Sequence, residues 1–396
     1  MKTLVIAPQP FFSPRGTPFS VYYRSLISSE LGVKMDFLTY GEGQDVDIPN
    51  FNIIRIPRFK SLGNVKLGPS PLKLFLDVFI IIKMFWLLLR NKYDVVHAHE
   101  EAVFFAWFFK PLFGYKLIYD MHSSLPQQLT NFQFTTSKIL INTFKFLEDK
   151  CLQSADAVIT ICPDLRDYVN TIITNKEKHF LIENSIFEDI RLKNVNKNSK
   201  SAEVTEDDLG LDGFINEGEQ LLVYAGTLEK YQGIDILIKS MKEVVQKNDK
   251  VKLLIVGGTE QQVKDFSSLA DELKLTEFIK FTGRVQQKLA KAYTNKADIL
   301  LSPRSDGTNT PLKIYEQLAS GKPLVATKIY SHTQVLTDDV AFLVEPNPED
   351  MAKGIVSALN DKEESQKKVV NAIKLYEDEY SRTVYKSKLK KLLENL

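Results

Sequence analysis

Cysteine and histidine are both scarce in this chain. Its 396 residues include two cysteines and five histidines. Two thiols cannot make a disulfide framework, and Cys151 and Cys162 lack the spacing of paired metal ligands. This usage is typical of a protein in a reducing cytoplasm, and we expect no metal site.

A strong charge of either sign is absent as well. The 51 Lys and Arg residues nearly balance the 50 Asp and Glu residues, which leaves a formal net charge of +1. No global field therefore favours nucleic acid or another polyanion as a partner. Hydrophobic residues make up 44% and charged residues 26%, a globular composition, and the length suits two domains of roughly 190 residues each.

No long apolar run is free of charge. At the N-terminus a short apolar run ends at Pro8, so we expect a first buried strand there rather than a signal peptide. Segment 72–89 approaches the length of a membrane span. Lys73, Asp77 and Lys83 interrupt it, and with Arg90 they fall in an arc of roughly 140° on a helical wheel. We expect an amphipathic helix with a wide apolar face.

What the chain does have is a repeated alternation of short apolar runs and helical stretches. The candidate strands are 3–7, 34–40, 52–56, 94–98, 116–120, 157–161 and 180–183, and then 220–225, 252–256, 278–281, 298–302, 323–326 and 341–344. This alternation indicates parallel sheets covered on both faces. We therefore predict an α/β protein with two doubly wound Rossmann-like domains, 1–190 and 191–380, that face a cleft. The polar segment 191–208 is the expected linker.

The most informative segment is 300–327, which predicts a strand, a turn and a helix. Thr310 suits the N-cap of that helix, with Pro311 at its first helical position. A helix N-terminus presents free N–H groups and a partial positive charge, which suit a diphosphate. Glu316 lies about one and a half turns into the helix, where its carboxylate can accept bonds from both ribose hydroxyls.

This segment resembles the donor-binding signature of the retaining family 4, or group 1, glycosyltransferases, which have the GT-B fold. Matches extend along much of the chain: 224–233 resembles the first turn of the donor domain, and 281–285 the stretch that lines the base pocket. Residues 14–17 resemble the loop that faces the donor phosphates, and 94–99 and 119–122 the two histidine-bearing strand ends.

The resemblance implies a retaining glycosyltransferase that moves a hexose-type sugar onto a glycan or lipid-linked acceptor, in cell-surface polysaccharide or glycolipid synthesis. The donor is a UDP- or GDP-linked sugar, a substrate rather than a cofactor. The residues expected to bind it are Arg15, Gly16, Thr17, Gly226, Thr227, Arg284, Val285, Thr308, Asn309, Thr310, Pro311, Lys313 and Glu316. His122 and Lys230 are the candidate catalytic residues, with His122 near the reacting face of the sugar.

Three positions depart from the family pattern. The first of the two usual Glu residues is replaced by Thr308, with Asp306 two residues earlier. An Arg and a Lys that usually neutralise the diphosphate are replaced by Thr227 and Gln232. Lys230, Arg15, Arg304 or Lys313 must then supply the positive charge. Lys230 and Lys313 are the expected substitutes, since both lie in well-matched segments.

Two short motifs could indicate a metal. His97 and His99 alternate on a strand, but no cluster of further ligands completes the set, so we expect structural or substrate hydrogen bonds. Asp45 and Asp47 form a D-x-D in a polar loop, away from any strand end that could use it. No metal is expected at either motif.

Other functions remain open at this point. One is a catalytically silent GT-B subunit that scaffolds a glycan-assembly complex; another is a nucleotide-sugar epimerase. The helical stretch 381–396 is expected, by resemblance, to cross back to the first domain. Residues 48–93 hold eight basic side chains and one acid, Asp77. With the apolar helix they predict peripheral contact of 72–92 with the cytoplasmic face of a membrane.

Overall fold

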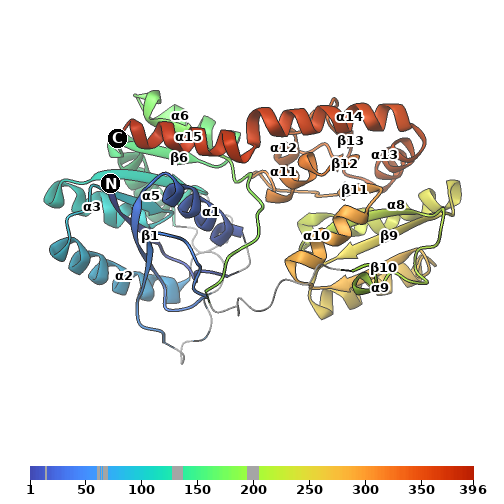
Figure 1. Cartoon of the computed structure of the whole chain (residues 1–396), viewed down its shortest axis with the longest axis horizontal. Helices are drawn as coiled ribbons and strands as arrows, with labels where there is room; N and C mark the ends of the chain where they lie inside the picture. Colours follow the sequence, from blue (N-terminus) through green and yellow to red (C-terminus); the bar gives the residue numbers. More distant parts are fainter. Residues whose placement is uncertain (14–15, 60–62, 64, 66–69, 127–136, 194–204) are drawn as a thin grey trace. The chain divides into compact units, whose positions relative to one another are not determined.

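The computed structural model describes residues 1–396 except 14–15, 60–62, 64, 66–69, 127–136 and 194–204 (Figure 1). Residue contacts divide the chain into two compact units. The first is Met1–Asn196 together with Arg382–Leu396, and the second is Lys197–Ser381. Each unit is a parallel sheet with helices on both faces, as the two series of alternating segments predict.

The first unit contains a seven-stranded sheet in the order β3-β2-β1-β4-β5-β6-β7. Every neighbouring pair is parallel. The strands are β1 (Lys2–Ala7), β2 (Lys34–Thr39), β3 (Phe51–Arg55), β4 (Val95–His99), β5 (Lys116–Met121), β6 (Ala157–Thr160) and β7 (His179–Leu181). The order reverses at β1 and β4, so the carboxyl ends of these strands flank the place where such sheets bind ligands.

Alternate residues of each strand build the two cores of this unit. Leu4 and Ile6 belong to one core, and Val5 and Ala7 belong to the other. The first core is covered by α2 (Pro71–Arg90), α3 (Ala102–Phe113), α5 (Lys138–Ser154) and α6 (Pro163–Ile172). The second is covered by α1 (Gly16–Glu30) and the C-terminal α15 (Arg382–Glu394), while a short 3₁₀ turn, η2 (Lys176–Lys178), precedes β7 (Figure 1).

The C-terminal helix α15 is an integral part of the first unit. Its Tyr385, Leu389 and Leu392 are buried in the second core. Arg382 and Lys386 both pair with Glu30 at the end of α1, at 2.5 and 3.2 Å. The two ends of the chain therefore stabilise the same unit.

The second unit contains a six-stranded parallel sheet in the order β10-β9-β8-β11-β12-β13. Its strands are β8 (Gln220–Ala225), β9 (Val251–Val256), β10 (Ile279–Gly283), β11 (Ile299–Ser302), β12 (Leu324–Thr327) and β13 (Phe342–Val344). Its helices are α7 (Glu206–Leu209), η3 (Lys230–Gln232), α8 (Ile234–Lys247), α9 (Glu260–Glu272), α10 (Gln287–Lys296), α11 (Leu312–Ala319), α12 (Tyr330–Thr333), α13 (Pro348–Asn360), α14 (Lys362–Leu375) and the π-helical turn η4 (Tyr376–Tyr380).

The thirteen predicted strands coincide with β1–β13, and their ends agree within two residues. The predicted fold class, two doubly wound Rossmann-like sheets, is confirmed. Of the predicted linker, 194–204 lies outside the described residues.

Helix α2 is present, but the prediction that its charged residues form one solvent-facing arc is wrong. Asp77 is buried, and its carboxylate accepts a hydrogen bond from the Tyr40 hydroxyl at 2.6 Å. Lys73 pairs with Glu101 of the α3 N-terminus at 2.8 Å. Only Lys83 and Arg90 of the four are exposed. Among the helices in the described part of the chain, none is long and apolar enough to cross a membrane.

Candidate functional site

Polar side chains gather at the carboxyl edge of each sheet. In the second unit the adjacent strands β8 and β11 end beside each other, and the loops after them lead to η3 and α11. Gly226 and Thr227 follow β8 directly, and both are exposed. We call this edge the donor half-site below, after the role that the sequence predicts for it.

The N-terminus of α11 begins one residue later than predicted. Pro311, not Thr310, is the N-cap, with an extended backbone (φ −65°, ψ 134°), and the helix starts at Leu312. The buried Thr310 hydroxyl has no hydrogen-bond partner in the described residues, so its predicted capping role is wrong. The Pro311 carbonyl instead accepts a bond from Ile314 N at 3.0 Å. The first N–H groups of a helix have no acceptor within the helix itself.

Lys313 is the most unusual side chain of this half-site. Its Nζ is shielded from solvent and has no hydrogen-bond partner among the described residues. It lies 4.2 Å from the ring centroid of Tyr224, and a Cβ placed on Gly226 would be 3.6 Å from it. Burial, reinforced by the nearby Arg304 guanidinium, lowers the pKa of Lys313 to about 7. An unpaired buried amine beside a helix N-terminus is a site prepared for an anion.

Arg304 shapes the loop between β11 and α11. Its Nε donates to the Asp306 carbonyl at 2.6 Å and its Nη1 to the Asn309 carbonyl at 3.3 Å. A Cβ at Gly307 (φ +118°) would lie 2.0 Å from Nη2, so only glycine allows this packing. The guanidinium also stacks over Tyr231 at 5.2 Å. Arg304 therefore positions Asn309 and adds positive charge near Lys313.

Glu316 lies one turn after Lys313 on α11 and is partly buried. Burial raises the pKa of its carboxyl group, an effect that Lys291 of α10 opposes. Arg284 is exposed and Val285 half-buried after β10, and Thr308 is exposed in the Arg304 loop. Lys230 is exposed at the start of η3 and has no side-chain partner in the described residues.

His332 of α12 was not predicted as part of this region. It is fully buried, its Nδ1 lies 2.8 Å from the Thr327 carbonyl, and its Nε2 lies 3.1 Å from the Ser302 hydroxyl. Burial lowers the pKa of His332 to about 3, so the imidazole is neutral at physiological pH. It joins the ends of β11 and β12 without adding charge beside Lys313.

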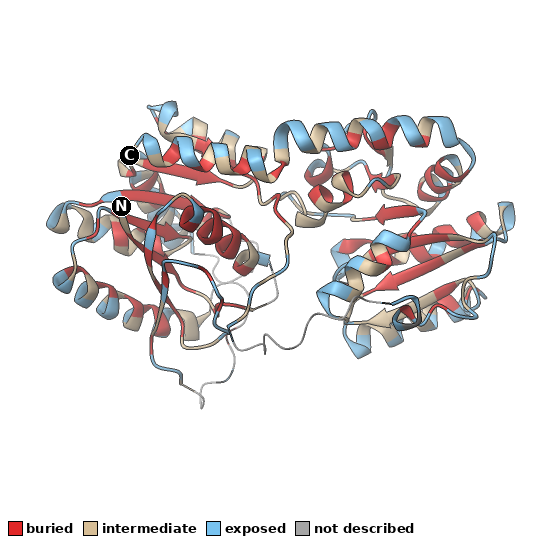
Figure 2. Ribbon diagram, in the orientation of Figure 1, coloured by how far each residue is buried: buried red, intermediate tan, exposed pale blue. Residues whose placement is uncertain are grey.

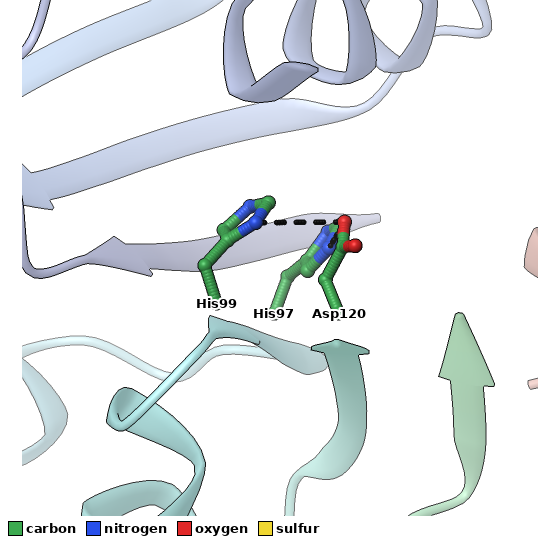
Figure 3. Close-up of side chains that lie close together, drawn as sticks. All are labelled: His97, His99 and Asp120. Carbon is green, nitrogen blue, oxygen red and sulfur yellow. Dashed lines mark hydrogen bonds and ion pairs between the residues drawn. The ribbon is translucent and has the colours of Figure 1, made fainter. Parts of the chain in front are cut away.

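The first unit has its own polar cluster at the ends of β4 and β5, where His97, His99 and Asp120 converge (Figure 3). The Asp120 carboxylate lies 3.0 Å from His97 Nε2 and 3.5 Å from His99 Nδ1. His122 Nε2 is 3.3 Å from Asp120 and 3.2 Å from His99 Nδ1. This edge is called the acceptor-side half-site below.

Arg24 of α1 completes this cluster. Its guanidinium contacts Asp120 with Nε at 2.8 Å and Nη2 at 3.3 Å, and both residues are buried. Burial by itself would raise the pKa of the Asp120 carboxyl. Arg24 and the histidines lower this pKa by more, so it lies well below the usual value. Burial lowers the pKa of His99, which is therefore neutral at physiological pH.

The prediction that no further ligand joins His97 and His99 is wrong, because Asp120 of the neighbouring strand lies beside them. These three residues are the one group in the described part of the chain with ligand atoms close enough to hold a metal ion. The Arg24 guanidinium is paired with Asp120 Oδ2, the same oxygen that faces His97 and His99, and its positive charge opposes a cation there. The arrangement fits a charged hydrogen-bond network better than a metal centre. Asp45 of the D-x-D pairs with Arg55 at 2.7 Å.

Glu100 follows His99 with an unusual backbone. Its φ is +52°, a conformation that non-glycine residues rarely adopt. Its carboxylate accepts a bond from the Ser123 hydroxyl at 2.9 Å, and burial raises the pKa of Glu100 to about 7. Gly16 and Thr17 open α1 after β1, whereas Arg15 lies outside the described residues.

The expected site residues did not include Arg24, Tyr224, Tyr231 or His332. Tyr224 and Tyr231 do lie in the segment 224–233 that resembles the first turn of the donor domain. Arg24 carried a usable signal, because it is the one charge of α1 before its last residue. His332 carried none, since a single histidine in a short helix does not by itself indicate a site.

Comparison with known proteins gives a consistent result for both units. Residues 212–375 match the family model described as glycosyl transferases group 1, and residues 28–187 match the model described as glycosyltransferase family 4. A phosphatidyl-myo-inositol mannosyltransferase of Mycobacterium tuberculosis is 28% identical over 156 residues, which cover 38% of this chain and 40% of that protein. The matched region thus spans less than half the length of this relative.

Two further relatives match more of the chain. An alpha-monoglucosyldiacylglycerol synthase of Streptococcus pneumoniae is 26% identical over 54% of this chain and 47% of its own length. A D-inositol 3-phosphate glycosyltransferase of Corynebacterium aurimucosum is 23% identical over 84% of this chain and 80% of its own length.

Solved structures with a similar fold cover the whole chain. A sucrose-phosphate synthase from Thermosynechococcus elongatus has a TM-score of 0.73 at 16% identity and covers 99% of this chain and 98% of its own. Anabaena HepE in complex with UDP has a TM-score of 0.72 at 14% identity and covers 100% of both chains.

Proposed function

Because the chain belongs to the group 1 and family 4 glycosyltransferases of the GT-B fold, we propose that it transfers a hexose-type sugar from a nucleoside diphosphate sugar to a glycan or lipid-linked acceptor. Relatives named as a phosphatidyl-myo-inositol mannosyltransferase and an alpha-monoglucosyldiacylglycerol synthase favour a lipid-linked acceptor. The structure of HepE with UDP favours a uridine donor, with GDP as the alternative base. Two free, buried cysteines support a reducing cytoplasm as its location.

The observation that carries this proposal is the unpaired Lys313 amine at the N-terminus of α11. A buried amine without a hydrogen-bond partner is costly, and the contact with the Tyr224 ring does not supply one. A diphosphate supplies the missing partner, and the N–H groups of α11 add donors on the same side. Lys313 thus takes over the charge that Thr227 and Gln232 cannot provide, and Arg304 reinforces it from the neighbouring loop.

The chemical step follows from this charge. As the bond between the anomeric carbon and the diphosphate oxygen breaks, negative charge develops on the leaving group. Lys313 and the positive end of α11 stabilise it without a metal, and the exposed Lys230 supplies a second cation when it reaches the same phosphates. The acceptor hydroxyl attacks the same face of the sugar, and its proton passes to the departing phosphate, so the anomeric configuration is retained.

The remaining residues bind and orient the substrates. Glu316 accepts bonds from the ribose hydroxyls, and Arg284 and Val285 frame the base. Thr308, Asn309, Gly226 and Thr227 line the sugar and diphosphate. The expected contact of Arg15, Gly16 and Thr17 with the donor stays a prediction. His122, held by Asp120 and His99, contacts the sugar near its reacting face.

A panel of UDP-, GDP- and other nucleotide sugars in a thermal-shift assay tests donor binding, since a ligand of the native state raises the melting temperature. We expect UDP or GDP sugars to stabilise the wild type and to stabilise Lys313→Met much less. Lys264→Met, an exposed substitution on α9, is the matched control.

Product analysis then separates the alternatives. A glycosyltransferase releases nucleoside diphosphate, an epimerase converts one nucleotide sugar into another, and a silent scaffold does neither. Absence of any nucleotide effect on melting would contradict the proposed function.

A further inference from the structure

A buried acid of α5 lies behind the acceptor-side half-site. Glu148 is fully shielded from solvent. Its Oε1 accepts bonds from the Ser124 hydroxyl at 2.8 Å and the Tyr168 hydroxyl at 3.0 Å, and its Oε2 accepts one from Leu125 N at 2.9 Å. These partners are all uncharged. Because burying a carboxylate without a cation is costly, packing alone does not account for Glu148.

Two of the three donors belong to the segment that directly follows β5. This segment, residues 122–125, is called the His122 segment below. The strands of the first sheet are largely buried (Figure 2), and β5 pairs with β6 as far as Met121. The His122 segment lies beyond that pairing. Its position therefore depends on the side chains that hold it rather than on the sheet.

Side chains hold the His122 segment from two directions. The Ser123 hydroxyl donates to the Glu100 carboxylate at 2.9 Å, which ties the segment to the loop after β4. Glu148 ties the next two residues to α5. His122 itself begins the segment, and its Nε2 lies 3.3 Å from Asp120. A shift of the segment would therefore change the place of the imidazole that faces Asp120.

We propose that Glu148 is a positioning residue of the acceptor-side half-site, which holds the His122 segment and so fixes the His122 imidazole against Asp120. Glu148 touches no substrate in this role. The inference rests on the proposed function, in which His122 contacts the sugar near its reacting face. Small displacements of such a contact are expensive, because a shift of about 1 Å can slow a reaction by about 100-fold.

The hydrogen-bond pattern favours this role over one in fold stability alone. Tyr168 of α6 would suffice to join α5 to α6, yet two of the three bonds of Glu148 go to the His122 segment. A carboxylate suits the task because its two oxygens accept several bonds at once, here one from a backbone N–H and two from hydroxyl groups.

The first measurement needs no substrate. With isotope-labelled histidine, side-chain NMR spectra of the full chain report on its five histidines, and His122→Asn identifies the His122 signal. Glu148→Met removes the carboxylate at similar length and should shift the His122 signal. The signal of His332, which lies in the second unit, should stay in place.

Sugar transfer is the second measurement. Glu148→Met should lower kcat by about 10- to 100-fold, as expected for a displaced contact at the reacting centre. Affinity for UDP or GDP, measured by calorimetry, should stay unchanged, because the donor half-site belongs to the second unit. Glu148→Gln should restore most of kcat. Its carbonyl oxygen can accept the bond from Leu125 N, and its NH₂ group can donate to the two hydroxyl oxygens.

Milder variants keep the test decisive if Glu148→Met does not fold. Ser124→Ala and Tyr168→Phe each remove one bond to Glu148 and should each lower kcat by about 2- to 10-fold. Ser240→Ala is the control for Ser124, since both are 1% exposed and Ser240 donates to a backbone carbonyl at 2.7 Å. Tyr115→Phe is the control for Tyr168, since the buried Tyr115 hydroxyl donates to a carbonyl at 2.6 Å. Both controls should keep the wild-type kcat and His122 signal.

Two results would overturn the inference. One is an unshifted His122 signal with an unchanged kcat in folded Glu148→Met. The other is an equal loss of kcat in Ser124→Ala and Ser240→Ala, which would reduce the role of Glu148 to fold stability. If the wild type transfers no sugar, the proposed function fails, whereas the His122 signal still decides whether Glu148 positions the segment.

Discussion

Lys313 leads to a prediction about proton uptake. In the empty protein its pKa is about 7, because burial and Arg304 disfavour the charged amine. A bound diphosphate would restore the pKa toward the ordinary value of roughly 10.4. At pH 8 about 0.9 of the empty sites hold neutral amine, so nucleotide binding should take up about 0.9 of a proton per site.

The direction of the pH dependence of nucleotide affinity follows from the linkage between binding and protonation. Because the bound state holds more protons than the empty state between pH 7 and about 10, nucleotide affinity should be greatest below pH 7 and fall as pH rises through this window. The groups that face Lys313 do not reverse this trend. Tyr224 has a pKa raised by burial, His332 has a pKa lowered to about 3, and Arg304 keeps its charge despite a lowered pKa.

Calorimetry in two buffers of different ionisation enthalpy measures the proton uptake directly. Lys313→Met should take up almost none and bind UDP or GDP roughly 10- to 150-fold more weakly, the usual loss of a charged hydrogen bond of about 1.5–3 kcal/mol. Lys313→Arg should keep most of the affinity but take up no proton, because Arg is charged in the empty site too. Lys264→Met serves as the control.

The reasoning would be refuted by wild-type binding that takes up no proton at pH 8 and by unchanged affinity in a folded Lys313→Met. Proton uptake that persists in Lys313→Met would assign the titration to another group.

Three further predictions follow from the two half-sites. Glu316→Ala should lower nucleotide affinity by about 10- to 150-fold without unfolding the protein, and calorimetry with a melting curve measures both. Transfer activity should persist in excess EDTA; loss of activity that magnesium or manganese restores would show that a carboxylate set such as Asp45 and Asp47 holds a required ion. Arg24→Met should reduce the free energy of unfolding by about 3–5 kcal/mol, because it leaves the buried Asp120 carboxylate without its permanently charged partner and with only the histidines beside it, and urea titration at neutral pH measures the loss. In strong acid this difference should shrink, since the stability due to the lowered pKa of Asp120 is lost as pH falls through that pKa.

The strands and the fold class could be predicted because they depend on the pattern of apolar residues within short segments of the chain. A run such as Leu221–Tyr224 is buried on both faces of a parallel sheet, so it is apolar throughout and stands out between polar helices. The spatial order of the strands was not predicted, because it depends on how the crossovers pack segments that are distant in the chain. The start of α11 was predicted less accurately. Thr310 is a residue type that is common at N-caps, but Pro311 is the N-cap, because its backbone is extended and the helix begins one residue later.

The half-sites were only partly predictable. Lys313 and Glu316 could be found because a strand, a loop and a helix N-terminus are contiguous in the chain. The pairing of Arg24 with Asp120 could not, because ninety-six residues separate them and only the packing of α1 on β5 brings them together.

The amino-acid sequence by itself determined the two α/β units, the positions of their strands along the chain and the segment that carries the donor half-site, because each of these depends on patterns within a few consecutive residues. Only the tertiary structure decided which side of α2 is buried, which cation near the donor half-site is left without a partner, and how Arg24 meets the histidine cluster. These depend on the environment that distant segments provide, where burial and pairing, not residue type, set the cost of a charge.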